Sequence, residues 1–176
     1  MKNELSYFGN DYLSEMDDEM KRLSRWGVGP KMALLTILYS AVLFAACFAF
    51  PGLFEDRFIP DPVALALACA LFCVGVPLFV ASYAAIDRSY QADVLNTKGV
   101  YRFCRHPLYA SFILFIVPGI ALLIHAWLLY TVPLFLYVLF RVFIRTEETY
   151  LAQRFGNDYI AYRARTNLLL PRFTRE

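Results

Sequence analysis

The chain has 176 residues, of which 59% are hydrophobic and 18% charged, and its formal net charge is +2 at pH 7. Soluble domains average about 45–50% apolar and about 25% charged residues, so this composition is atypical of them. It excludes a disordered or collagen-like chain, and the weak net charge argues against a nucleic-acid binder. Because the apolar residues are clustered, we predict a membrane protein.

Four apolar runs are predicted to cross the membrane as helices, over residues 32–50, 63–86, 108–124 and 127–144. A spanning helix needs about 20 apolar residues, and the last two runs, joined only by His125-Ala126, suit an antiparallel helical hairpin. The runs lack the alternation of a membrane β-strand, and backbone groups in lipid must bond within their own segment. The predicted fold class is therefore an all-α integral membrane protein with four transmembrane helices and cytoplasmic carboxyl-terminal helices.

Lys and Arg residues are unevenly distributed over the segments outside these runs. The segment before the first run, the loop between runs two and three, and the segment after run four are rich in them. The loop after run one holds only Arg57, beside acidic residues, and the loop after run three holds none. Since basic loops stay in the cytoplasm, both termini are predicted to be cytoplasmic.

The polar residues able to carry chemistry concentrate after residue 93. A loop leads into the third run and contains Arg105, His106 and Pro107. Pro107 suits the first turn of a helix, where its missing N–H costs nothing, so Arg105 and His106 are predicted at the helix start near the membrane surface. Such a helix end attracts carboxylates and phosphates.

A second polar segment follows the fourth run. Arg141, Arg145 and Glu148 are spaced to share one helix face where that helix leaves the bilayer. Further on, Gly156-Asn157-Asp158 predicts a helix break. Four apolar or aromatic residues around it recur at helical spacing and are predicted to pack inward: Leu151, Phe155, Tyr159 and Tyr162.

Each of these features has an ordinary explanation when taken alone. Basic residues beside membrane spans usually set topology or contact headgroups, and a Glu pair at a helix start complements the helix dipole. Their convergence on one membrane face favours instead a pocket for a polar cofactor of mixed charge. S-adenosylmethionine, a nucleotide and a lipid headgroup all fit this description. No Cys/His metal-ligand spacing is present, so no metal is predicted.

The order of the motifs resembles the isoprenylcysteine carboxyl methyltransferase family, whose wider group includes phospholipid N-methyltransferases. The resemblance covers about residues 93–173. It depends on Gly99-Val100-Tyr101, on Arg105-His106-Pro107-Leu108-Tyr109, on Arg145-Thr146-Glu147-Glu148, and on the segment 155–165. It departs from the family at Ser111, where Gly is common, and at 166–168, where Val-Pro-Arg is usual.

The resemblance implies an integral membrane enzyme that uses S-adenosylmethionine. Arg105 and Arg145 are implied to face the methyl acceptor, which would be lipidic or prenylated and would enter sideways from the bilayer. The implied cofactor-binding residues are Leu95, Asn96, Tyr101, His106, Pro107, Leu108, Tyr109, Glu147 and Glu148.

The predicted function is therefore a membrane methyltransferase like isoprenylcysteine carboxyl O-methyltransferases, acting at the cytoplasmic face. Residues 1–31 are expected to form a cytoplasmic segment, 32–92 the first two transmembrane helices, and 93–176 the methyltransferase-like region. The alternatives are a phospholipid N-methyltransferase, a small-thiol S-methyltransferase, a nicotinamide-dependent membrane reductase and a non-enzymatic membrane scaffold. Membrane lipids are expected partners, and nucleic acid is not.

Overall fold

A computed structural model describes residues 28–55 and 58–171 of the chain. Residues 1–27 of the expected cytoplasmic segment 1–31 therefore lie outside the described residues. In chain order the helical segments are α2 (Gly29–Ala49), α3 (Pro51–Phe54), α4 (Asp61–Ala92), the 3-10 turn η1 (Gly99–Arg102), α5 (Pro107–Ala110), the π-helical η2 (Ser111–Ile116), α6 (Val117–Ile124), the 3-10 turn η3 (Trp127–Tyr130) and α7 (Thr131–Arg165).

Four of the described helices are long and apolar enough to cross a membrane. They cover Gly29–Ala49, Asp61–Ser89, Pro107–Ile124 and Trp127–Arg165. Large apolar side chains on their outer faces are exposed in the isolated chain, among them Ile37, Phe48 and Val142. A water-soluble protein would bury such side chains, whereas a bilayer covers them with lipid. The prediction of a helical integral membrane protein with four spans is confirmed.

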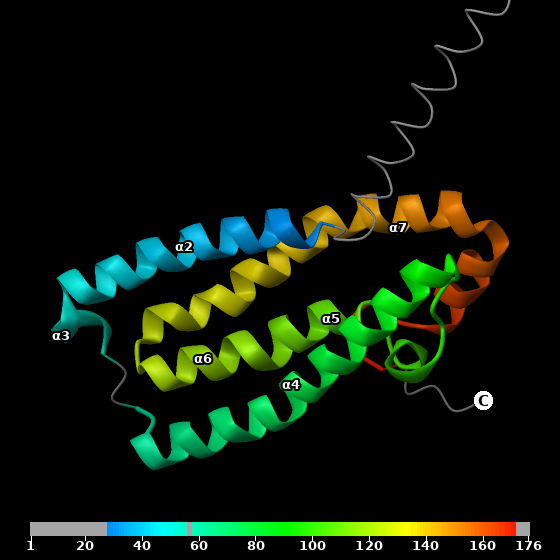
Figure 1. Ribbon diagram of the computed structural model, residues 1–176. Helices are drawn as coiled ribbons and strands as arrows, with labels where there is room; N and C mark the ends of the chain where they lie inside the picture. Colours follow the sequence, from blue (N-terminus) through cyan, green and yellow to red (C-terminus); the bar gives the residue numbers. More distant parts are fainter. Residues whose placement is uncertain (1–27, 56–57, 172–176) are drawn as a thin grey trace, which may run out of the picture.

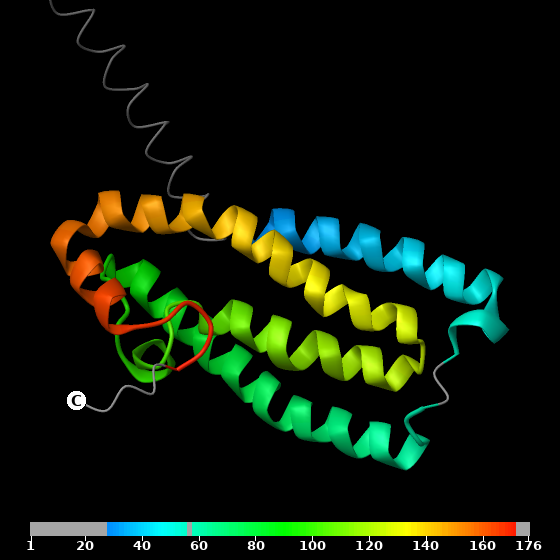
Figure 2. The ribbon, with the colours of Figure 1, turned by 180° about the vertical axis from the view of Figure 1, so that it is seen from behind.

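The long helices lie side by side in the order α2, α7, α5–α6, α4 (Figures 1 and 2). Helix α2 packs on the first half of α7, where the rings of Tyr39 and Phe135 stack 4.2 Å apart and the Tyr39 hydroxyl lies 3.0 Å from Thr131 Oγ1. The continuous helix formed by α5, η2 and α6 then separates α7 from α4. Its amino-terminal end, which carries Arg105 and His106, is thereby held between α4 and α7.

Helix α4 approaches its neighbour closely through small residues. Ala64, Ala68, Gly75 and Ser82 are all buried. A Cβ added at Gly75 would lie 2.6 Å from Phe115 Cβ, which is closer than real Cβ atoms come to another atom. Small residues at such seams let membrane helices pack backbone to backbone. This seam fixes the third span against α4.

The third span contains a π-helical stretch that no sequence pattern predicted. Pro107 begins the helix, as expected, but Ser111–Ile116 has the wider i→i+5 turn. Ser111 is fully buried, and its hydroxyl donates to the carbonyl oxygen of Leu108 at 2.6 Å. Single π turns inside helices are rare and occur often at functional sites.

Helix α7 extends beyond the other spans and then folds back sharply at Gly156 (Figure 1). This residue has φ 53° and ψ −128°, a conformation that favours glycine. The break predicted around Gly156 is therefore confirmed. The fold-back returns the last part of the chain to the loop between α4 and α5, and both views show the two segments together (Figure 2).

Candidate functional site

The carboxyl-terminal segment holds the loop before α5 by backbone hydrogen bonds. The N–H groups of Arg105 and His106 donate to the carbonyl oxygens of Asn167 and Leu168 at 2.8 and 3.0 Å. Pro107 then starts α5, where its missing N–H leaves no unsatisfied donor. Two segments about 60 residues apart in sequence thus fix the backbone of the Arg-His-Pro motif.

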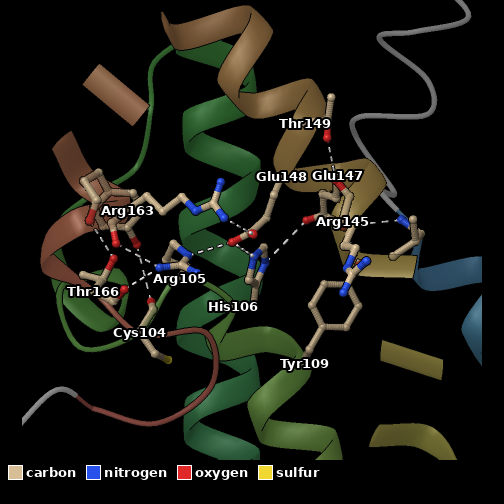
Figure 3. A network of polar contacts seen from close by, with 12 residues as sticks. Cys104, Arg105, His106, Tyr109, Arg145, Glu147, Glu148, Thr149, Arg163 and Thr166 are labelled. Atoms are coloured by element: carbon tan, nitrogen blue, oxygen red, sulfur yellow. Dashed lines mark hydrogen bonds and ion pairs between the residues drawn. The ribbon is translucent and has the colours of Figure 1, made fainter. Parts of the chain in front are cut away.

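Arg105 is buried, and two of its three guanidinium nitrogens donate to other protein groups (Figure 3). Its Nε donates to Glu148 Oε1 at 2.8 Å, and its Nη1 donates to the carbonyl oxygens of Arg163 and Thr166. The side chain therefore connects the second glutamate of the pair to the folded-back segment. This geometry favours a positioning role for Arg105 over the acceptor-facing role that the family resemblance implied.

His106 lies between the two glutamates. Its Nδ1 is 3.6 Å from Glu147 Oε1, and its Nε2 is 3.7 Å from Glu148 Oε1. The side chain is 4% exposed, yet Nε2 has no hydrogen-bond partner within the described residues. A buried polar atom without a partner is costly. A polar group of a ligand at this nitrogen would remove that cost.

Glu147 joins α7 to α5 and to the beginning of α2. Its Oε2 accepts a hydrogen bond from the Tyr109 hydroxyl at 2.9 Å and one from the Val28 backbone N–H at 3.5 Å. The Tyr109 and His106 rings both pack against Phe140, with ring centroids 5.3 and 5.8 Å away. The histidine-proline motif and the twin glutamates, which were predicted to lie together, are thus in direct contact.

Tyr101 and Cys104, in the loop that precedes Arg105 and His106, are buried. The Tyr162 hydroxyl donates to the Tyr101 carbonyl oxygen at 2.7 Å, which ties the loop to the folded-back segment. Burial raises the pKa of the Tyr101 hydroxyl far above its ordinary range, and the nearby Glu147 charge raises it further. Burial also raises the pKa of the Cys104 thiol to about 11.

The remaining expected cofactor residues surround this centre. Pro107 is buried, whereas Leu95 and Leu108 are half-buried. The Asn96 side chain connects its loop to α4: Nδ2 donates to the Ala85 carbonyl oxygen of that helix at 3.2 Å, and Oδ1 accepts from the Lys98 backbone N–H at 3.1 Å. Asn96 therefore shapes the loop, which leaves its backbone and Leu95 as the groups able to face a ligand.

Arg145 lies on the exposed side of α7, away from the buried Arg105. It lines an open hollow of about 630 Å³ together with Glu148, Thr149, Ala152, Gln153 and Arg163. A second, smaller hollow of about 410 Å³ also includes Arg145. The two arginines predicted to act together thus have different surroundings, and Arg145 is the one that faces open space.

The sequence alone did not identify several residues of this network. The backbone carbonyl oxygens of Arg163 and Thr166 accept hydrogen bonds from Arg105. Backbone acceptors cannot be recognised from a sequence pattern, because every residue has one. Phe140 was part of an apolar run without any distinguishing mark. Tyr159 and Tyr162 were recognised by their helical spacing as packing residues, and both are buried as predicted.

Comparison with protein-family models gives a match that covers the sequence motifs of this site. The model of the isoprenylcysteine carboxyl methyltransferase (ICMT) family matches residues 64–153, which is about half of the chain. The match includes the Arg-His-Pro motif, the helices after it and the twin glutamates. The chain belongs to the ICMT family. Among curated proteins, none matches the chain.

The ICMT match differs in extent from the resemblance noted in the sequence. It begins inside α4, so it includes most of the second span, and it ends before the fold-back at Gly156. The folded-back segment, which supplies the partners of Arg105, lies outside the matched residues. Family membership makes the chain a membrane methyltransferase.

The ICMT site has the donor and acceptor groups that S-adenosylmethionine requires. The carboxylates of Glu147 and Glu148 can accept from an amino group or from ribose hydroxyls, and His106 has a buried nitrogen available. Aromatic rings of Tyr101 and Tyr109 can flank a purine. The residues present therefore fit this cofactor.

Proposed function

We propose that this ICMT-family protein is an S-adenosylmethionine-dependent methyltransferase that acts on a lipidic or prenylated acceptor at the cytoplasmic face of the membrane. The observation that carries the proposal is the direct contact between two distant motifs. Tyr109 donates to Glu147 at 2.9 Å, and Arg105 donates to Glu148 at 2.8 Å. These contacts assemble acidic, aromatic and imidazole groups around one point.

The cofactor would be held by His106, Tyr101, Tyr109 and the two glutamates, with Pro107, Leu108, Leu95 and Asn96 around them. When bound, the cofactor supplies a methyl group on a positively charged sulfur, which needs no acid catalyst to leave. The protein then has to align the acceptor and exclude water. The buried position of His106 and Glu148 provides such an environment.

The acceptor would be held on the Arg145 side of α7, where the hollow opens. Arg105 acts there only indirectly, because its donors are used by Glu148 and by two carbonyl oxygens. A lipidic acceptor can reach this region through the bilayer, since α7 and α2 expose apolar side chains such as Val142 and Leu34 to the lipid.

The membrane arrangement belongs to the same proposal. In this proposal both termini and the carboxyl-terminal helix are cytoplasmic, and the support for it is the contrast between the basic segments at the site end of the bundle and the nearly uncharged turn between α6 and α7. The third and fourth spans then form the helical hairpin, and residues 93–176 form the methyltransferase-like region. The first span begins at Gly29, so the cytoplasmic segment expected over residues 1–31 would end three residues earlier, at residue 28.

The direct test is methyl transfer in membranes that contain the protein, with a radiolabelled methyl donor. An S-prenylated N-acetylcysteine, a phosphatidylethanolamine and a hydrophobic small thiol are supplied in turn as acceptors. We expect label in the prenylated carboxylate, and loss of that label in Glu147→Gln, because Gln cannot provide the anionic acceptor that Tyr109 contacts.

The alternatives give other results in this transfer assay or in measurements of cofactor binding. Label in the phospholipid or in the thiol assigns those acceptors instead. Binding of NADPH without binding of S-adenosylhomocysteine supports a membrane reductase, and binding of neither supports a scaffold.

A further inference from the structure

The fold-back at Gly156 places a third arginine at the site. Arg163 lies seven residues after the break, and its side chain is 57% exposed. It returns toward Glu148, so that Arg163 and Arg145 lie on either side of this glutamate (Figure 3). Both arginines line the hollow of about 630 Å³. No sequence pattern distinguished Arg163 from the other basic residues near the carboxyl terminus.

The charges around the hollow are not balanced. Glu148 is the acidic residue of the lining, and its closest cationic partner is Arg105 at 2.8 Å, a residue outside the lining. Arg163 Nη2 lies 3.8 Å from Glu148 Oε2, which is beyond hydrogen-bond reach. Within residues 28–55 and 58–171 no ion pair involves Arg145. The hollow therefore presents two guanidinium groups with unused donors.

We propose that Arg163 is a further acceptor-positioning residue, which together with Arg145 holds the anionic group of the methyl acceptor in this hollow. The proposal rests on the proposed methyltransferase function and specifies how that function selects its acceptor. Guanidinium groups bind carboxylate and phosphate oxygens through paired N–H donors. The neutral liners Thr149 and Gln153 add further polar groups.

This assignment agrees with the chemistry of the transfer. A carboxylate oxygen forms a bond to the methyl carbon while the carbon–sulfur bond breaks and its electron pair remains on sulfur. The acceptor loses one negative charge and the donor one positive charge, so no proton has to be removed. Methyl transfer to a carboxylate therefore needs no general base, and two arginines that orient the carboxylate are sufficient. The same two positive charges would repel a protonated amine.

The test compares acceptor binding by wild type with that by Arg163→Gln and Arg163→Lys, in nanodiscs of phosphatidylcholine. The matched control is Arg165→Gln, because Arg165 is exposed on the same segment and, among the residues that the structure describes, donates only to the Ala161 carbonyl oxygen of its own helix. Two probes are titrated: an S-prenylated N-acetylcysteine and its neutral carboxamide. S-adenosylhomocysteine binding and the apparent Tm are measured for each variant.

We expect wild type and Arg165→Gln to bind the carboxylate about tenfold or more tightly than the amide. Arg163→Gln should lose that preference while its S-adenosylhomocysteine affinity and Tm stay unchanged, and Arg163→Lys should restore part of it. A preference that persists in Arg163→Gln would overturn the inference and leave the methyltransferase proposal intact.

A second arm separates the acceptor from lipid headgroups as the source of the anion. The titrations are repeated in nanodiscs with phosphatidylglycerol. If Arg163 binds headgroup phosphates instead, the effect of Arg163→Gln will appear only with the anionic lipid and equally for both probes, which would also overturn the inference. Failure of the wild type to bind S-adenosylhomocysteine would instead refute the proposed function, and this inference with it.

Discussion

Arg105 is a buried cation whose partners come from two parts of the chain, one before and one after the fold-back at Gly156. It donates to Glu148 and to the carbonyl oxygens of Arg163 and Thr166. The sequence identified this arginine as a site residue, because it precedes His-Pro at a predicted helix start. Its partners could not be predicted, since two are backbone oxygens brought there by the fold-back. The sequence therefore indicated that Arg105 belongs to the site, but its role in the site could be inferred only from the structure.

Replacing Arg105 by Met should destabilise the protein strongly. The change leaves the buried Glu148 carboxylate without its closest cation, and breaking one partner of a buried pair costs about 3–5 kcal/mol. The matched control is Arg145→Met, an exposed change expected to stay within about 0.5 kcal/mol. Thermal unfolding in detergent measures both, and equal Tm values for the two variants would contradict the positioning role.

Cys104 offers a separate prediction at the residue scale. Burial raises the pKa of its thiol to about 11, and the residue is 5% exposed. Because the thiolate is the reactive form, only about one thiol in a thousand is ionised at pH 8, and ionisation rises about tenfold for each pH unit up to 11. In a variant with the other three cysteines replaced by Ser, maleimide should label Cys104 slowly until the protein is denatured. Rapid labelling of the native protein at pH 8 would show that this loop is open.

Among the helices, the sequence predicted the spans well and their internal irregularities poorly. Apolar runs of sufficient length marked all four spans, and Gly156 marked the fold-back. The π-helical stretch Ser111–Ile116 left no such mark, because the same apolar residues would fit an ordinary helix. The close approach at Gly75 also depends on a neighbour, Phe115, that lies 40 residues away in sequence.

Gly156→Ala should disturb the site from a distance. Its positive φ is strained for any residue with a Cβ, although the added Cβ would meet no atom within 4 Å. The cost therefore comes from the backbone alone and is about 1–3 kcal/mol. The folded-back segment carries the carbonyl oxygens that accept hydrogen bonds from Arg105. We therefore expect Gly156→Ala to have a lower Tm and to bind the methyl acceptor more weakly.

The matched control for this variant is Gly52→Ala. A Cβ at Gly52 also meets nothing within 4 Å, but its φ is ordinary. We expect this control to behave as wild type. An unchanged Tm and unchanged acceptor binding in Gly156→Ala would show that the fold-back tolerates another conformation.

Over the whole molecule, the site lies at one end of the helical row, and its predicted side is the cytoplasm. The loop between α4 and α5 carries Lys98 at this end, and the loop between α3 and α4 carries Phe58 at the other. In a cysteine-free background, a membrane-impermeant maleimide added to intact cells should label Phe58→Cys, which replaces a side chain that is 92% exposed. Lys98→Cys should be labelled only after permeabilisation. The reverse pattern would place the site outside the cell.

The fold class and the family could both be inferred from the sequence, because membrane spans and ordered motifs are local properties. The pairing of Arg105 with the fold-back and the position of Arg163 depend on tertiary structure. In the proposed function these features hold the methyl acceptor, so the proposal about the acceptor depends on the three-dimensional arrangement and not on the sequence alone.

The central claim is that the Arg-His-Pro segment and the twin glutamates form one cofactor site. Calorimetric titration of S-adenosylhomocysteine into the detergent-solubilised protein tests it most directly. The wild type and Tyr39→Phe, which alters a hydroxyl contact with Thr131 far from the site, should bind with equal affinity, whereas His106→Ala and Glu147→Ala should show no binding. Binding that survives in both site variants, or no binding by the wild type, would contradict the account.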